Sequence, residues 1–477
     1  MTRRSILLVC VVGLFAAGCT VGPDYRRPDV TMPSAYRGAG TAAPMPAPAL
    51  SFGDLVWWQL FQDPGLQELI RTALAANYDL QVAVSRILQA QAQVTIARSQ
   101  QFPTVNAQAD APYTGYVGNS RPPSTPAQAF SPEGGLTLGW ELDLWGKFRR
   151  ATESARAQLL ASEEVRNAVV TSLVAQVAQA YFTLRTLDLD LEISKRTVVS
   201  RQQSVELVRA RLEGGVAGIL DLQQAETLLY TATKSIPDIE RQIEQTENLI
   251  SILLGKDPGP IPRGRSLDQQ LVPPTVPPGL PVELVARRPD IRQAEQQLIA
   301  ANAQIGVAKS QLFPQVTVSG FAGAGGAVIS GQTFGPLGIF NVLPVINLPI
   351  FNMGRLQAGV DLADAQTQEA VLRYQQTIQQ ALREVSDGLV EVRKRQEFRE
   401  QQELLTKTLA EASQVSRMRY EGGVSSYLEV LDTERQFFQA ELDLTVAQRD
   451  ELAAIVQLYK ALGGGWQPEQ ASQTPQG

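Results

Sequence analysis

Nine residues, Ala97-Arg98-Ser99-Gln100-Gln101-Phe102-Pro103-Thr104-Val105, recur 211 positions later as Ala308-Lys309-Ser310-Gln311-Leu312-Phe313-Pro314-Gln315-Val316. A second stretch, Arg209-Ala210-Arg211-Leu212-Glu213-Gly214-Gly215-Val216, recurs 208 positions later as Arg417-Met418-Arg419-Tyr420-Glu421-Gly422-Gly423-Val424. The second spacing holds without a gap from Gly146 and Gly354 to Gly255 and Gly463. Chance similarity does not explain so long a register, so the chain is one unit written twice.

The duplication predicts how the chain is divided. We expect a signal peptide at 1–18, an extended N-terminal arm at 19–65, repeat 1 at 66–255, a proline-rich linker at 256–281, repeat 2 at 282–465 and a tail at 466–477. Prolines stiffen the linker and favour an extended backbone there.

Each repeat predicts the same helices, in a fold that is mainly α with some β. A first helix (66–100 and 283–312) precedes a polar stretch, which leads into a very long helix (147–212 and 355–420). A Gly-Gly turn then gives a return helix (219–254 and 427–462). At 1.5 Å per residue the long helix would extend ~100 Å, which no compact domain contains. Apolar residues seven apart in the return helix predict coiled-coil hairpins.

The polar stretch of each repeat carries two strand patterns. Apolar and polar residues alternate at 103–113 and 134–144, and more weakly at 314–324 and 340–350, where Pro344 and Pro349 interrupt. We expect loops at 114–133 and 325–337. Such strands suit a membrane barrel, although a soluble half-buried hairpin has the same period. Four strands cannot close a barrel, and three copies would supply twelve.

Composition narrows the function. The 477-residue chain has no histidine and two cysteines, with 42 Lys and Arg against 48 Asp and Glu. It therefore lacks the usual catalytic base at neutral pH and the commonest metal ligand. The acidic balance argues against nucleic acid, because proteins that bind it present a basic face. No nucleophile–base pair, phosphate loop or metal cluster is recognisable, so we expect no enzyme, metal or cofactor.

The first residues have the parts of a secretory signal: Arg3 and Arg4, an apolar run at 6–17, and small residues before Cys19. The run is shorter than the ~20 residues of a membrane-spanning helix. The residues that end at Cys19 match a bacterial lipobox, although Ala16 stands where the motif prefers leucine. We therefore expect diacylglycerol and an N-acyl chain on Cys19. An ordinary signal with an incidental cysteine is the alternative.

The chain resembles the TolC-like outer membrane efflux proteins, in the branch of OprM/NodT-type lipoproteins. The residues that carry the resemblance are Gly18–Tyr25, Trp57-Trp58 with Phe61 and Asp63, Asn77-Tyr78-Asp79-Leu80, Arg287-Arg288-Pro289-Asp290-Ile291, and the turns Glu213–Val216 and Glu421–Val424. The resemblance covers essentially the whole mature chain. It implies a homotrimer with a 12-stranded transmembrane β-barrel, four strands per chain, continued by a long periplasmic α-helical barrel.

The resemblance also implies a function. Such a protein is lipid-anchored in the bacterial outer membrane, extends into the periplasm, and is the passive exit duct of a tripartite efflux pump. Its partners would be two further copies, a periplasmic adaptor, an inner-membrane pump of the RND type and outer-membrane lipid.

The resemblance places a periplasmic gate at Leu428 and Asp432, which lie at i and i+4 on one helix face. Three copies would form an apolar ring and an acidic ring, and Arg435 would tether Asp432. An ordinary solvated helix tip is the alternative. The exposed turns would contact the adaptor through Gly214, Gly215, Val216, Gly422, Gly423 and Val424.

Two other functions fit part of the pattern. A general diffusion porin needs neither partner nor gate, and a structural envelope lipoprotein would be a coiled-coil spacer without a pore. The sequence does not identify the cargo, because a smooth polar lumen carries little information about its substrates.

Overall fold

The computed structural model describes residues 20–37, 52, 55–115, 128–270, 281–329 and 331–466. The expected signal peptide, Cys19 and most of the C-terminal tail lie outside these residues. The chain divides into two compact units. One contains the strands with residues 86–163 and 293–375 around them, and the other contains the helical hairpins. Among the described residues, no helix combines the length and apolar character needed to cross a membrane.

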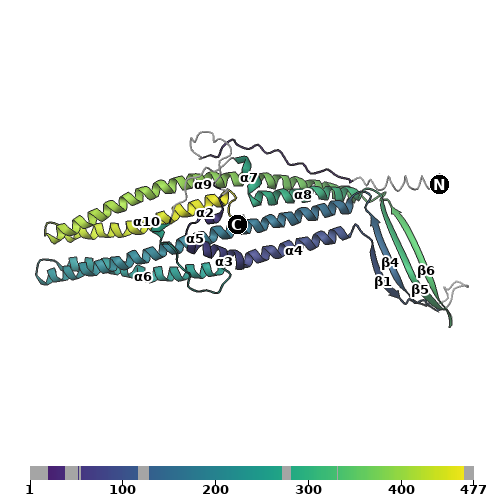
Figure 1. The fold of residues 1–477 in the computed structure, drawn as a ribbon, viewed down its shortest axis with the longest axis horizontal. Helices are drawn as coiled ribbons and strands as arrows, with labels where there is room; N and C mark the ends of the chain where they lie inside the picture. Colours follow the sequence, from purple (N-terminus) through teal and green to yellow (C-terminus); the bar gives the residue numbers. More distant parts are fainter. Residues whose placement is uncertain are drawn as a thin grey trace, which may run out of the picture. The chain divides into compact units, whose positions relative to one another are not determined.

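Four long helices form two hairpins, one per repeat (Figure 1). The first helix of each hairpin has 67 residues, as the repeat predicts, and the second has 35. Gly215 and Gly423 have φ of 73° and 72° in the turns, a left-handed backbone that glycine adopts without steric cost. The helices are α5 (Lys147–Glu213), α6 (Ile219–Leu253), α9 (Arg355–Glu421) and α10 (Tyr427–Ala461).

The first helix of each repeat is broken, and the prediction of a single helix was wrong in both repeats. Asn77 and Arg288 stand at the breaks. The side chain of Asn77 accepts a hydrogen bond from the backbone N–H of Leu80 at 3.1 Å and so caps a new helix. In the second repeat, Pro289 restricts the residue before it and starts the next helix. The pieces are α3 (Pro64–Ala76), α4 (Tyr78–Ser99), α7 (Pro281–Arg287) and α8 (Pro289–Ser310).

Two expected irregular segments contain short helices. The segment expected as an extended arm includes α2 (Trp57–Leu60), whose Trp57 is buried. The expected linker includes the 3-10 helix η2 (Leu267–Gln269). Apolar burial explains both departures, because Leu60 and Leu267 are also inside the core.

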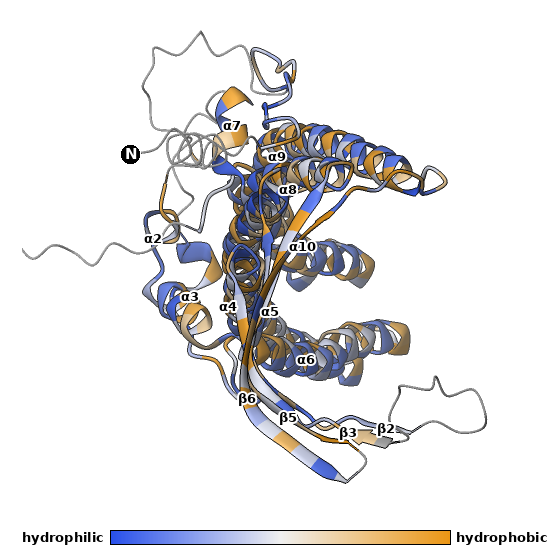
Figure 2. Cartoon of the chain, turned by 90° about the vertical axis from the view of Figure 1, so that its right-hand side faces the viewer, coloured by the Kyte–Doolittle hydropathy of each residue, from blue (hydrophilic) through white to orange (hydrophobic). Residues whose placement is uncertain are grey.

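The strands form one antiparallel sheet, in which the long strands follow the order β1-β4-β5-β6. The hydropathy colours of Figure 2 show apolar residues recurring along them. The strands are β1 (Thr104–Asp110), β2 (Tyr113–Gly115), β3 (Gln128–Phe130), β4 (Glu133–Leu142), β5 (Gln315–Ile329) and β6 (Gln332–Asn347).

The strand ends differ from the predicted ones. The strand expected at 103–113 stops at Asp110 and resumes at Tyr113, because Pro112 has no N–H to donate. The strand expected at 134–144 ends at Leu142, and β3 and most of β2 lie in the expected loop 114–133. The loop expected at 325–337 is largely strand, because β5 continues past 324 to Ile329 and β6 begins at Gln332 instead of 340. The strand expected at 340–350 ends at Asn347. Pro344 fits inside β6 because β6 is an edge strand of this sheet, where proline is tolerated.

The pairing register repeats the duplication of the sequence. Thr104 lies opposite Gly139 in the first repeat, and Gln315 lies opposite Asn347 in the second. These two pairs are related by the same spacings of 211 and 208 residues. The repeats therefore have one strand register as well as one sequence pattern.

The N-terminal segment runs beside helix α8. The backbone N–H of Val21 donates to the carbonyl of Trp145 at 3.0 Å, and Asn302 donates to the carbonyl of Pro23 at 3.0 Å. Arg27 forms two hydrogen bonds of 2.7 Å with Glu295. These contacts fix the residues that follow Cys19.

Candidate functional site

The predicted gate residues lie on the first turns of α10, at the tip of the second hairpin. Arg435 Nη2 donates to Asp432 Oδ1 at 3.1 Å, and Gln436 Nε2 donates to Asp432 Oδ2 at 2.6 Å. The hydrogen bonds from Gln436 and Arg435 hold the pKa of the Asp432 carboxyl below its usual value. Leu428 is exposed. An exposed pair of this kind contributes little to the stability of one chain, so the role of these residues in gating stays a prediction.

The predicted adaptor-contact turns are also exposed. Gly214, Gly215, Gly422 and Gly423 are open to solvent, and the side chains of Val216 and Val424 extend from the turns. An exposed apolar side chain at each tip is available to a partner protein.

Three buried hydroxyls distinguish the second tip from the first. Within the described residues, the side-chain hydroxyl oxygens of Tyr420, Ser425 and Tyr427 have no hydrogen-bond partner. The two tyrosine rings meet edge to face, with centroids 5.2 Å apart. Each unpaired buried hydroxyl costs about 1–3 kcal/mol. The equivalent residues of the first tip are all aliphatic, namely Leu212, Ala217 and Ile219.

The aliphatic counterparts show that the hairpin turn does not require these hydroxyls. The three unpaired hydroxyls therefore make the second tip less stable than it would be with aliphatic side chains at the same positions. The sequence analysis did not predict this cluster, although aligning the two repeats shows hydroxyl residues in the second where the first has aliphatic ones.

Arg211 connects the first hairpin to the second. Its guanidinium donates to the carbonyls of Tyr420 at 2.8 Å and Glu421 at 2.9 Å. It also lies over the ring of Tyr420, 4.6 Å from the centroid. A cation at the last carbonyls of a helix stabilises that end, so Arg211 caps α9 from the other hairpin.

A charged seam continues this contact between the hairpins. Arg417 Nη2 donates to the buried Glu434 at 2.5 Å and to Ser200 of the first hairpin at 3.0 Å. The equivalent pair of the first repeat, Arg209 and Glu226, is more exposed and 3.1 Å apart. A cavity of about 310 Å³ remains at the seam. The contact is therefore polar and incompletely filled, unlike an apolar core.

Arg201 is buried beside this cavity, donates to the carbonyl of Leu228 at 2.5 Å and lies over the ring of Phe438. Burial lowers its pKa. Because arginine stays charged in proteins, the seam contains a cation whose desolvation opposes the contact.

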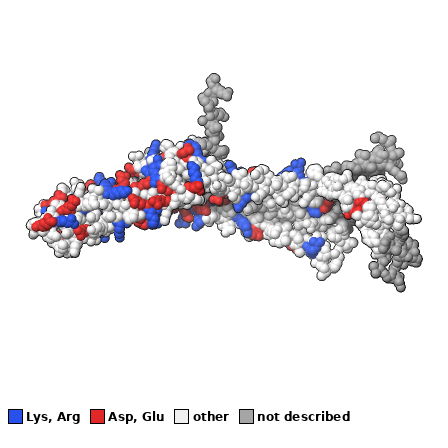
Figure 3. Space-filling model, turned by 90° about the horizontal axis from the view of Figure 1, so that it is seen from below, with Lys and Arg blue, Asp and Glu red and all other residues white. Residues whose placement is uncertain are grey.

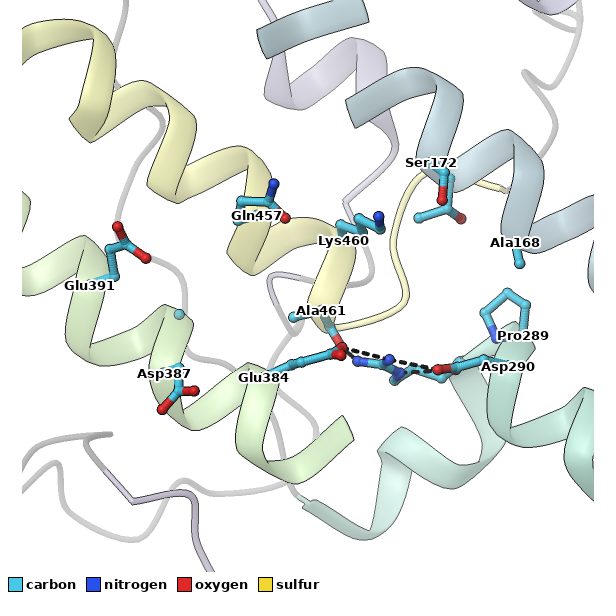
Figure 4. Close-up of a pocket in the computed structure, with 13 residues that line it drawn as sticks. Ala168, Ser172, Pro289, Asp290, Glu384, Asp387, Glu391, Gln457, Lys460 and Ala461 are labelled. Atoms are coloured by element: carbon cyan, nitrogen blue, oxygen red, sulfur yellow. Dashed lines mark hydrogen bonds and ion pairs between the residues drawn. The ribbon is translucent and has the colours of Figure 1, made fainter. Parts of the chain in front are cut away.

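A second charged cavity lies around Arg288 (Figure 4). Arg288 is buried and donates to Asp290 at 2.6 Å, to Glu384 at 2.8 Å and to the carbonyl of Ala461 at 2.8 Å. Burial lowers the pKa of Arg288, and the bonds and charges of Asp290 and Glu384 more than offset this, so the pKa is raised. The cavity measures about 530 Å³, and its other charged residues are Asp387, Glu391 and Lys460.

The charged residues that line the two cavities are Arg, Lys, Asp and Glu. Within the described part of the chain, no group of three or more His, Cys, Asp or Glu side chains could hold a metal. Acidic and basic side chains alternate over the helical hairpins on the face shown in Figure 3, and the strands carry few charges there. The hairpin surface is thus mixed in charge and hydrated.

Comparison with known proteins agrees with the duplicated architecture. The family model for outer membrane efflux proteins matches twice, at residues 69–256 and 280–464, once in each repeat. A toluene efflux pump outer membrane protein, TtgC of Pseudomonas putida, is 35% identical, covering 99% of this chain and 100% of the relative. The cation efflux system protein CusC of Escherichia coli is 33% identical, covering 97% and 99%.

A solved structure shows the same fold. The open state of the Neisseria gonorrhoeae outer membrane channel MtrE superposes with a TM-score of 0.84 at 32% identity, covering 94% of this chain and 99% of that one. The predicted fold class and family are therefore confirmed. The chain belongs to the outer membrane efflux proteins, and it acts in the outer membrane as the exit channel of an efflux system.

Proposed function

We propose that three copies of this chain close one barrel and one helical tunnel. The free edges of the sheet carry this proposal. Among the described strands, β1 pairs only with β4 at one edge, and β6 pairs only with β5 at the other. Unpaired backbone groups are very unfavourable in lipid, so the edges need other copies as partners. In the same proposal residues 1–18 are removed, and diacylglycerol and an N-acyl chain on Cys19 anchor the protein.

The tunnel would receive substrates passively from a periplasmic adaptor and an inner-membrane pump of the RND type. The exposed turns at Gly214–Val216 and Gly422–Val424 would meet the adaptor. The names of the relatives include toluene and cations, so the pump rather than the duct would select the cargo. The duct itself performs no catalysis in this proposal.

The gate would close at Leu428 and Asp432, with Arg435 holding Asp432. Three carboxylates brought close together repel one another, and a cation or a wider ring relieves the repulsion. The unpaired hydroxyls of Tyr420, Ser425 and Tyr427 support a second hairpin that moves. In another conformation of this tip, the same hydroxyls could form the hydrogen bonds that they lack here.

Single-channel recording of the reconstituted, acylated protein tests the proposal. We expect a low resting conductance with brief openings, and a heat-labile trimer on gels. Steady high conductance of the isolated protein would favour the porin. No conductance and no trimer would favour the structural lipoprotein.

A further inference from the structure

The cavity at the seam between the two hairpins is lined by more positive than negative charge. Its charged lining consists of three arginines and two glutamates, namely Arg196, Arg201, Arg417, Glu434 and Glu441. Arg417 bonds to Glu434 and Arg196 bonds to Glu441, each at 2.5 Å. These two ion pairs balance in charge, so the charge of Arg201 is left over.

Arg201 retains hydrogen-bond donors that the protein does not use. Its side chain is buried, at 3% exposure, and its Nη1 donates to the carbonyl of Leu228. Its Nε and Nη2 form no hydrogen bond with any of the described residues. These two groups lie on one edge of the guanidinium and direct their N–H bonds in parallel, which matches the two oxygens of a carboxylate. A bound anion would also offset the cost of burying this cation.

The duplication shows that the long helix does not require arginine at this position. In the register of 208 residues, Leu409 is the equivalent of Arg201. Leu404 is likewise the equivalent of Arg196. Helix pairing alone therefore does not explain the two arginines of the first hairpin, whereas binding an anion in the cavity would.

We propose that this cavity binds a small monovalent carboxylate, whose oxygens accept from Nε and Nη2 of Arg201. A single negative charge balances the one charge left over in the lining. The volume of about 310 Å³ lies at the lower end of the range for small-molecule sites. Ala410 and Phe437 supply an apolar wall for the body of such a molecule. This site is separate from the predicted gate and turns, and it does not depend on the proposed function.

Both hairpins contribute to the site, so the ligand would join them. Arg201 belongs to α5, Arg417 to α9 and Phe437 to α10. A molecule that binds only when these helices are together stabilises that arrangement by mass action. We therefore expect the carboxylate to raise the melting temperature of the protein as well as to bind it.

Calorimetric titration of the detergent-solubilised, full-length protein with sodium benzoate tests the site. Benzamide has the same shape without the charge and serves as the control ligand, with ionic strength held constant. We expect one benzoate per chain, and binding of benzamide that is weaker by about tenfold or more, because it loses charged hydrogen bonds. No binding of benzoate, or equal binding of benzamide, would overturn the proposal.

Three variants assign the binding to Arg201. Arg201→Met removes the charge and both donors and should weaken benzoate binding about tenfold or more. Arg201→Lys keeps the charge without the paired donors and should weaken it less. Arg209→Met removes an arginine of the same hairpin that is more exposed and pairs with Glu226, so binding should stay unchanged.

Circular dichroism and the melting temperature without ligand establish that each variant is folded. If Arg201→Met does not fold, the comparison of Arg201→Lys with Arg209→Met carries the test. Unchanged binding in Arg201→Met or in Arg201→Lys would overturn the assignment to the paired donors of Arg201. An equal loss in Arg209→Met would show a general effect of charge instead of a site.

Discussion

Asn77 and Arg288 occupy equivalent positions in the two repeats and bind equivalent carbonyls. Asn77 donates to the carbonyl of Leu253 at 3.0 Å, and Arg288 donates to that of Ala461 at 2.8 Å. Both join a helix break to the last turn of the return helix. A neutral amide does this in the first repeat, and a buried cation with two carboxylate partners does it in the second.

Removing the two side chains should therefore have unequal effects. We expect Arg288→Ala to lower the free energy of unfolding by about 2 kcal/mol, because it removes the hydrogen bonds of a buried cation to Asp290 and Glu384. Asn77→Ala should cost about 1 kcal/mol, the contribution of a neutral hydrogen bond. Urea unfolding of detergent-solubilised protein, followed by circular dichroism, measures both. Equal losses would mean that the ion pairs around Arg288 add nothing.

The unpaired hydroxyl of Tyr427 predicts a stabilising substitution. Tyr427→Phe keeps the ring and removes a buried group without a partner, so the free energy of unfolding should rise by about 1 kcal/mol. The exposed Tyr230 gives the control, since Tyr230→Phe should change it by less than about 0.5 kcal/mol. If the hydroxyl gains a partner when the gate opens, the stabilised variant should export less. A destabilised Tyr427→Phe would contradict the assignment of an unpaired hydroxyl.

The gate proposal predicts a change in resting conductance. Asp432→Ala combined with Arg435→Ala removes the ion pair at the second tip and should raise the conductance of single channels at rest. The equivalent residues of the first tip give a matched control, and Gln224→Ala with Thr227→Ala should leave conductance unchanged. Unaltered conductance in the first double variant would reject these residues as the gate.

Asp190 predicts a dependence on pH in a chain without histidine. Burial raises the pKa of its carboxyl to about 6, although Thr445 donates a hydrogen bond to it. The folded state therefore holds this proton more tightly than the unfolded state. The free energy of unfolding should fall by about 2–3 kcal/mol as pH rises from about 4 to about 6, and then level off.

Asp190→Asn should remove that fall in the free energy of unfolding. The variant should therefore become more stable relative to the natural protein as pH rises across the same interval. Urea unfolding at a series of pH values measures this gain. Asp443→Asn, which removes an exposed carboxylate from α10, controls for the loss of one charge. A gain that is constant across the interval would show that Asp190 is not the group responsible.

Periodicity and duplication predicted the elements but not their interruptions. The 67-residue helices and the Gly-Gly turns follow from local spacing, which the sequence displays directly. The breaks at Asn77 and Arg288 have local signals, the helix cap by Asn77 and the proline at 289, but their contacts with carbonyls more than 170 residues away follow only from tertiary packing. The extension of β6 through Pro344 depends on which strand lies at an edge, and that is a property of the whole sheet.

The candidate site was predictable where the family resemblance named a position. The resemblance placed all three predicted gate residues, Leu428, Asp432 and Arg435, near the start of one helix. The contact between Arg435 and Asp432 follows from their spacing of three. Arg211, Arg201 and Tyr427 act through contacts between hairpins, so their surroundings depend on tertiary packing. Their burial and partners could be read only from the structure.

The unlike tips have a consequence for symmetry. Six identical single-repeat chains would form a ring in which every tip must behave alike. In the proposed assembly, a ring of three duplicated chains would alternate two kinds of tip, one with Leu212 and Ile219 and the other with Tyr420 and Tyr427. The ring would have six similar tips but only threefold symmetry in its side chains. Every second tip could then change its conformation while the tips between them keep the diameter of the ring.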